Sequence, residues 1–210
     1  MTSPPAATES AVVVPVPEAE PAVGRHRARL DSAAGLGVPA HVTVLFPFVA
    51  PPDLTSTTMR QLAAAIGSVA EFGCVFRRTA WFNERVLWLA PEPDAPFRAL
   101  IRAVTAAFPD YPPYGGAHSD VVPHLTIGEN PAANSRGEPT GSGPLATGNA
   151  GPLAVGGADQ VRVAELRAAE SDVRRALPVP ARISRAWLMT GSAAAGSWRR
   201  VADLPLGPPA

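Results

Sequence analysis

The chain contains two short strings of the same form, HVTV at residues 41–44 and HLTI at residues 124–127. Each string lies in an apolar stretch that follows a proline. Side chains alternate between faces along a β-strand, so the His and the Thr of each string point one way while its two aliphatic residues point the other. The pattern predicts two strands that are buried on one face and carry an imidazole and a hydroxyl on the opposite face.

This set of groups suits phosphate-ester chemistry. One imidazole takes a proton from the attacking oxygen, the other gives a proton to the leaving oxygen, and the hydroxyls hydrogen-bond the phosphoryl oxygens. An ordinary histidine pKa near 6.5 would make a pair of one neutral and one charged imidazole accessible near pH 7. Two alternatives stay open: a binding module that recognises a phosphorylated nucleotide or RNA end without turning it over, and a structural role for both histidines. The residues alone do not say which of His41 and His124 is the base.

The expected secondary structure repeats around the two motifs. Each is followed by a helix and then by two strands joined by a turn, which favours an internal duplication. After His41 these elements cover residues 55–70, 72–82 and 86–90, and after His124 they cover 161–177, 183–190 and 198–206. The other expected elements are strands over 11–17, 38–48 and 121–127 and helices over 18–34 and 95–108.

Composition limits the partners. The formal net charge is zero at pH 7 and no lysine is present, so the sequence offers no basic tail or stripe for a long nucleic-acid backbone. We expect a monomer that takes a small nucleotide or an RNA end, with no duplex and no membrane partner. No charged leader or membrane-length apolar run is found, which favours a cytoplasmic protein. Cys74 is the single cysteine and is expected to be a buried thiol.

We expect one bilobal domain over residues 11–206, between a disordered N-terminus over 1–10 and a C-terminal tail over 207–210. Residues 128–157 are rich in Gly, Pro, Ala, Ser and Asn. This composition predicts a flexible excursion with no fold of its own, directly behind the second motif.

The two motifs in their contexts, PAHVTVLFPF and PPYGG…DVVPHLTIGEN, resemble the 2H phosphoesterase superfamily, specifically its 2′-5′ RNA ligase-like branch. The resemblance implies an α+β fold in which two lobes, each an antiparallel sheet backed by helices, face each other across a central groove. It implies that His41 and His124 are the catalytic pair and that Thr43 and Thr126 bind phosphate, with no cofactor. The implied substrates are 2′,3′-cyclic phosphates or 2′-5′ linkages, which the enzyme would hydrolyse or, in reverse, ligate.

Several other residues are weaker candidates. Tyr111 and Tyr114 precede the second motif, where a ring would either stack on a base or pack as part of a rigid turn. Trp81 is a candidate for lining the groove, together with Phe82, or for the core. His118 invites a metal site, but no HExxH, CxxC or comparable set completes one, so we expect no metal. His26 lies among Arg25, Arg27 and Arg29 on an expected surface helix and is assigned no role. Walker, dinucleotide-binding and nucleophile-elbow motifs are absent from the sequence.

Overall fold

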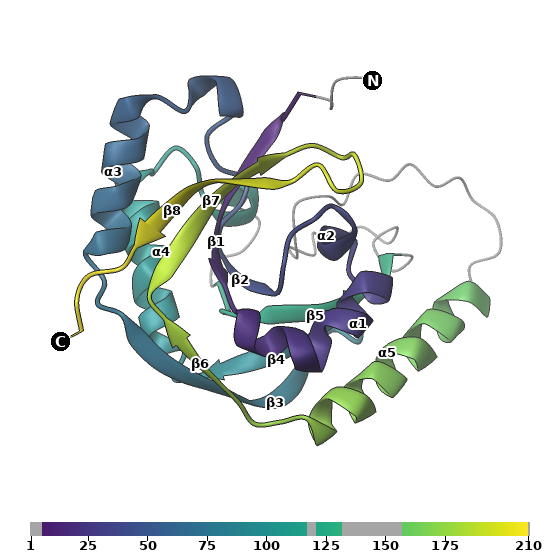
Figure 1. Cartoon of the computed structure of the whole chain (residues 1–210). Coiled ribbons are helices and arrows are strands. Elements are labelled where there is room, and N and C mark those ends of the chain that lie inside the picture. Colours follow the sequence, from purple (N-terminus) through teal and green to yellow (C-terminus); the bar gives the residue numbers. More distant parts are fainter. Residues whose placement is uncertain (1–5, 117–120, 132–156, 210) are drawn as a thin grey trace.

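The computed structural model describes residues 6–116, 121–131 and 157–209. The strands are β1 (Glu9–Pro15), β2 (His41–Leu45), β3 (Phe72–Phe82), β4 (Val86–Glu92), β5 (Leu125–Glu129), β6 (Val179–Ile183), β7 (Arg185–Gly191) and β8 (Arg199–Pro205). They form two four-stranded antiparallel sheets, a first sheet in the order β2-β1-β7-β8 and a second in the order β5-β4-β3-β6 (Figure 1). The first motif begins β2 and the second leads into β5, so each motif lies at the edge of its own sheet.

Helices cover the two sheets in pairs. They are α1 (Glu20–Leu30), α2 (Ser32–Gly35), α3 (Ser56–Gly67), α4 (Ala95–Ala107) and α5 (Gly157–Arg175), with short 3₁₀ turns at Pro17–Ala19 and Pro51–Asp53 and an irregular turn at Pro113–Gly116. In Figure 1, α3 and α4 lie together beside the first sheet and α1 and α5 beside the second. The expected α+β architecture of two antiparallel sheets backed by helices is confirmed.

The two halves of the chain are interleaved. The hairpin that follows the first motif, β3 and β4, belongs to the second sheet, whereas β7 and β8, which follow the second motif, belong to the first. The connecting helices cross in the same way: α1 leads to β2 but packs on β5, and α4 leads to β5 but packs on β2. Each motif strand is therefore supported by elements from both halves of the sequence.

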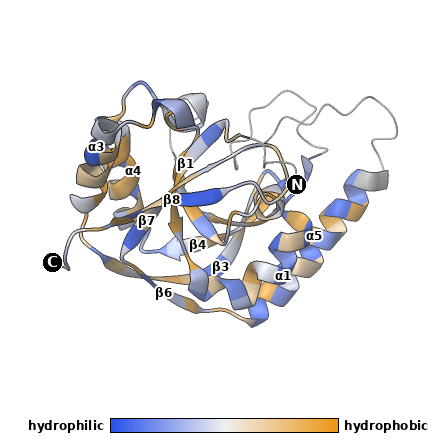
Figure 2. Cartoon of the chain, turned by 45° about the horizontal axis from the view of Figure 1, so that its top comes forward, coloured by the Kyte–Doolittle hydropathy of each residue, from blue (hydrophilic) through white to orange (hydrophobic). Residues whose placement is uncertain are grey.

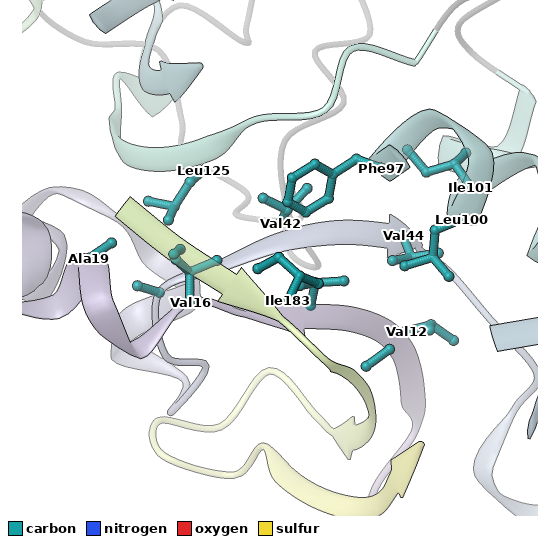
Figure 3. Close-up of a cluster of buried hydrophobic side chains, with 14 of the residues drawn as sticks. Val12, Val16, Ala19, Val42, Val44, Phe97, Leu100, Ile101, Leu125 and Ile183 are labelled. Atoms are coloured by element: carbon teal, nitrogen blue, oxygen red, sulfur yellow. The ribbon is translucent and has the colours of Figure 1, made fainter. Parts of the chain in front are cut away.

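One apolar core runs behind both motif strands (Figure 3). Val42 and Val44 of β2 and Leu125 and Ile127 of β5 all belong to it and are almost fully buried, as the alternation within the motifs predicted. Figure 2 shows hydrophobic residues along the strands and mixed hydrophobic and hydrophilic residues along α1 and α5, as expected for helices with one buried side. Because the aliphatic residues face this core, the histidines and threonines occupy the opposite faces of the sheets.

Several boundaries differ from the sequence predictions. The helix expected over 18–34 is interrupted at Asp31, which has an extended backbone and caps α2 by accepting a hydrogen bond from the Ala33 N–H at 3.0 Å. The strand expected over 183–190 is β7, and a strand that was not predicted, β6, precedes it in the second sheet, so the chain passes from one sheet to the other at Ser184. Order at the N-terminus begins earlier than expected, since β1 starts at Glu9.

The expectation that the helix around His26 lies on the surface is also wrong in part. Arg25 and Arg29 are exposed, but His26 and Arg27 are buried. Most of the excursion predicted over 128–157 lies outside the described residues; within them, β5 continues to Glu129 and α5 begins at Gly157. Cys74 is buried, as expected. In the described part of the chain, no helix is long and apolar enough to cross a membrane.

Candidate active site

The two motif histidines have the same local geometry. His41 Nδ1 lies 2.7 Å from the carbonyl oxygen of Pro39, and His124 Nδ1 lies 2.7 Å from the carbonyl oxygen of Val122. A carbonyl oxygen can only accept a hydrogen bond, so each Nδ1 carries a hydrogen and donates it. Both neutral rings are thereby held in the same tautomer, in which Nε2 is the atom that can accept or return a proton.

The motif side chains come from two neighbouring segments, β2 and the start of β5, which are edge strands of the two sheets. β2 and β5 are in contact, and His124 is near enough for its charge to act on the pKa of His41. In the strand register Thr43 is opposite Val13 and Thr126 is opposite Trp88. These partners place both threonines on the faces that carry the histidines. The structure thus brings together the residues that the two motifs predicted.

A small pocket adjoins the first motif. His41 and Thr43 contribute its two polar side chains, while the indole N–H of Trp198 is already bound to the carbonyl oxygen of Ser192 at 3.1 Å. The rest of the wall is apolar and consists of Ala11, Val13, Val38, Phe46, Met189 and Trp198.

Two aromatic rings fix the second histidine. The Phe82 ring meets His124 edge-on at 5.0 Å between centroids, and the Trp88 ring meets it at 5.8 Å. Phe82 and Trp88 are themselves stacked at 4.7 Å. The place of Trp88 beside His124 could not be predicted from the sequence, because its position opposite Thr126 follows from the pairing of β4 with β5, which the local pattern does not specify.

Burial controls the protonation of both histidines. His41 is 7% exposed and His124 is 9% exposed. Desolvation, reinforced by the Arg27 guanidinium, lowers the pKa of His41 to about 3, and desolvation also lowers the pKa of His124. The expectation that both imidazoles titrate near 6.5 is therefore wrong. In the protein without ligand, both rings are neutral at pH 7.

Tyr114 reaches the first motif from the segment before the second. Its hydroxyl is hydrogen-bonded to the Thr43 side chain, and its backbone N–H donates to the carbonyl oxygen of Phe46 at 2.7 Å. Its φ is +54°, a left-handed conformation that a tyrosine adopts only when surrounding contacts hold it. Burial raises the pKa of the hydroxyl to about 12, so the hydroxyl stays protonated. Tyr114 thus belongs to the site through Thr43 rather than as a ring presented for stacking.

Two other candidates lie away from the histidines. The Tyr111 ring packs against Phe48 at 5.8 Å between centroids, beside the core. Trp81 occupies the face of β3 opposite to Phe82 and lies under the guanidinium of Arg167 in α5, 4.3 Å from its ring centroid. The expectation that Trp81 lines the groove is wrong, because alternation along β3 turns it toward α5.

No group of three or more His, Cys, Asp or Glu side chains that would hold a metal ion occurs within residues 6–116, 121–131 and 157–209. His118 lies outside these ranges.

A family model for the 2′-5′ RNA ligase superfamily matches residues 15–139, more than half of the chain and both motifs. The chain belongs to this superfamily. Membership supports a phosphoesterase activity of the 2H type in general terms. No match was found among curated protein sequences.

Solved structures resemble this superfamily member over nearly its whole length. Escherichia coli LigT in apo form is 14% identical, with 96% of this chain and 98% of that chain covered and a TM-score of 0.52. The protein TT0787 of Thermus thermophilus is 14% identical, with 95% and 98% covered and a TM-score of 0.58. E. coli LigT complexed with 3′-AMP is 13% identical, with 96% and 99% covered and a TM-score of 0.53. At these identities the likeness is one of fold.

Proposed function

We propose that this protein is a metal-independent phosphoesterase that acts on 2′,3′-cyclic phosphate or 2′-5′ phosphodiester bonds of RNA ends or small nucleotides. The observation that carries the proposal is the matched anchoring of His41 and His124, each held through Nδ1 by a carbonyl oxygen two residues upstream. Two imidazoles on contacting segments, each with Nε2 as the atom that takes up or releases a proton, suit acid–base catalysis at one phosphorus atom. The E. coli LigT structures with 3′-AMP and NADP⁺ support a ligand of nucleotide size.

In the proposed reaction, one proton is taken from the attacking water and another is given to the leaving ribose oxygen. One Nε2 accepts a proton from water as the water oxygen bonds to phosphorus. The bond from phosphorus to the ribose oxygen breaks, and the other imidazole gives its Nε2 proton to that leaving oxygen. If a ribose hydroxyl of a second nucleotide attacks the cyclic phosphate in place of water, it forms the new bond to phosphorus as the ring bond breaks, and the same step becomes a ligation. Each of the two groups contributes about 10²- to 10⁴-fold to the rate.

The general acid is charged by substrate binding. Because burial keeps both rings neutral at rest, the negative charge of a bound phosphodiester must favour protonation of one of them. Desolvation is the largest cause of the lowered pKa of both histidines, and the Arg27 cation lowers the pKa of His41 further, so a bound phosphodiester protonates His124 more readily than His41. His41 is therefore assigned as the base and His124 as the acid in the hydrolytic direction.

The threonine hydroxyls hold the phosphoryl oxygens. A hydroxyl has one hydrogen to donate, so Thr43 can give its hydrogen to a phosphoryl oxygen only if Tyr114 is the donor in their mutual bond. The protonated hydroxyl of Tyr114 supplies that donor. Thr126 takes the equivalent place in the second motif, and its side chain is half-buried like that of Thr43.

The proposal is tested by incubating the protein in EDTA with a panel of nucleoside 2′,3′-cyclic phosphates and 2′-5′ dinucleotides. We expect product from the wild type and a loss of nearly all activity in His41→Asn and in His124→Asn. His26→Asn is the matched control, because His26 is a buried histidine on α1 that contacts Asp172 and Arg25 rather than the motifs. This variant should retain activity. Absence of product from the wild type with every substrate would refute the proposal.

A non-catalytic binding module is the second candidate. The observation that favours it is the neutral state of both rings, which leaves no charged proton donor in the protein without ligand. It predicts phosphate or nucleotide binding without product, and only modest weakening of binding in the two histidine variants.

A further inference from the structure

One buried guanidinium contacts the backbone of the second histidine motif and of the segment that leads into the first. Arg27 lies on α1 and its side chain is 2% exposed. Its single Nε hydrogen is shared between Asp31 Oδ2 at 2.9 Å and the carbonyl oxygen of Thr126 at 3.2 Å, and its Nη2 donates to the carbonyl oxygen of Val38 at 3.3 Å. Thr126 belongs to the second motif and Val38 leads into the first. A single planar group thus connects the segments that carry His41 and His124.

Two carboxylates hold this guanidinium in place. Asp31 Oδ2 accepts from Nε at 2.9 Å and from Nη2 at 2.7 Å, and Asp31 is itself fixed as the cap of α2. Glu20 Oε1 lies 3.9 Å from Nη1 and accepts a hydrogen bond at 2.6 Å from the N–H of Ala40, the residue before His41. The network therefore holds the segment before the first motif at two backbone positions, Val38 and Ala40.

Stabilisation of the fold does not by itself explain why the Arg27 guanidinium is buried. A buried ion pair gains little over apolar side chains of similar volume, because both charges lose their hydration. The two motif strands belong to different sheets with no strand ladder between them in the described residues. Their relative position therefore depends on packing and on contacts such as those of Arg27.

We propose that Arg27 is a positioning residue that fixes the first histidine motif against the second and so sets the spacing of the two imidazoles. The inference rests on the proposed function, since that spacing matters only if both rings act on one phosphoryl group. Displacement of a reacting group by about 1 Å costs up to about 10²-fold in rate. Loss of the Arg27 contacts should therefore reduce kcat more than it changes KM.

The test compares two changes at Arg27 with a matched control. Arg27→Lys keeps the charge but loses the planar fork, and Arg27→Met combined with Asp31→Asn removes the guanidinium without leaving a buried carboxylate unpaired. Arg29→Met is the control, because Arg29 lies on the same helix, is 68% exposed and pairs only with Glu165 in the described contacts. With a nucleoside 2′,3′-cyclic phosphate, kcat should fall about 10- to 100-fold in both Arg27 variants, KM should change less than about threefold, and the control should match the wild type.

Ring ¹⁵N resonances of the two histidines give a readout that does not need activity. The charged groups that act on His41 are Arg27 and His124, and Asp31 and Glu20 are the carboxylates that face Arg27. The ring resonances of both histidines should shift in both Arg27 variants, because the second motif and the segment that leads into the first each lose a contact. The pKa of His41 should rise in the double variant, which lacks the cation, and stay near its wild-type value in Arg27→Lys.

The two proposals fail in distinguishable ways. If the wild type forms no product, the proposed phosphoesterase function fails, and the ring resonances alone decide the role of Arg27. Shifted resonances of both histidine rings in the Arg27 variants support the positioning role of Arg27, and unchanged resonances overturn it. If the wild type is active but both Arg27 variants keep its kcat and its ring resonances and differ only in urea midpoint, Arg27 is a purely structural residue. That result overturns the inference while leaving the proposed function intact.

Discussion

The buried His41 ring should make the stability of this protein fall in mild acid. Its pKa is about 3 in the folded protein, against about 6.5 for an unfolded chain. Between these values the unfolded state binds one more proton than the folded state, so acid favours unfolding. The contribution of neutral His41 to folding is complete above about pH 6.5 and is lost as the pH falls toward about 3, at about 1.4 kcal/mol per pH unit. From pH 7 to pH 5 the loss amounts to about 2 kcal/mol.

Urea unfolding at pH 7 and pH 5 measures this loss when the wild type is compared with His41→Asn. The asparagine amide can still donate to the Pro39 carbonyl oxygen but cannot take up a proton. The free energy of unfolding should fall by about 2 kcal/mol more in the wild type than in His41→Asn over this interval. Thr43→Val, a change at the same site that leaves the imidazole in place, should keep the wild-type pH dependence. Equal pH dependence in the wild type and His41→Asn would refute the reasoning.

Three further outcomes follow from the site. Tyr114→Phe removes the hydroxyl that is hydrogen-bonded to Thr43, and loss of one hydrogen bond of about 1 kcal/mol should lower kcat/KM about 5-fold; an unchanged value would show that the Tyr114 hydroxyl does not orient Thr43. Trp88→Leu should lower activity, because the Trp88 ring packs on His124. Trp81→Leu should leave activity within about twofold, because the Trp81 ring packs under α5. Equal losses in the two variants would contradict the placement of Trp88 beside His124 and of Trp81 beside α5. Binding of inorganic phosphate at pH 7 should take up a proton, seen by calorimetry in buffers of different ionisation enthalpy, and a heat independent of buffer would contradict substrate-assisted protonation.

Local sequence signals predicted the elements that carry the motifs. The alternation within HVTV and HLTI placed Val42 and Leu125 in the core and, by exclusion, the histidines on the opposite faces. The helix expected over 55–70 is α3, and Thr55 caps it by accepting a hydrogen bond from the N–H of Thr58 at 3.2 Å. These features depend on neighbours within a few residues, so the sequence contains the information needed to predict them.

Features that depend on distant partners could not be predicted. Which sheet receives β3 and β4 is decided by pairing with β5 and β6, far along the chain. Arg27 looks like Arg25 and Arg29 in the sequence, and it is buried because its hydrogen-bond acceptors come from residues 11 and 99 positions away. The lowered pKa of His41 has the same origin, since desolvation requires the assembled sheets. Helical spacing alone contains none of this information.

The central claim is that the two imidazoles act as one acid–base unit on a phosphodiester. The most direct measurement is kcat/KM in EDTA for a nucleoside 2′,3′-cyclic phosphate with His41→Asn, His124→Asn and the double variant. Groups that act as a unit are not additive, so each single variant should lose about 10²- to 10⁴-fold and the double variant little more than either. Product formation by the double variant at the wild-type rate, or losses that multiply as for independent sites, would contradict the account.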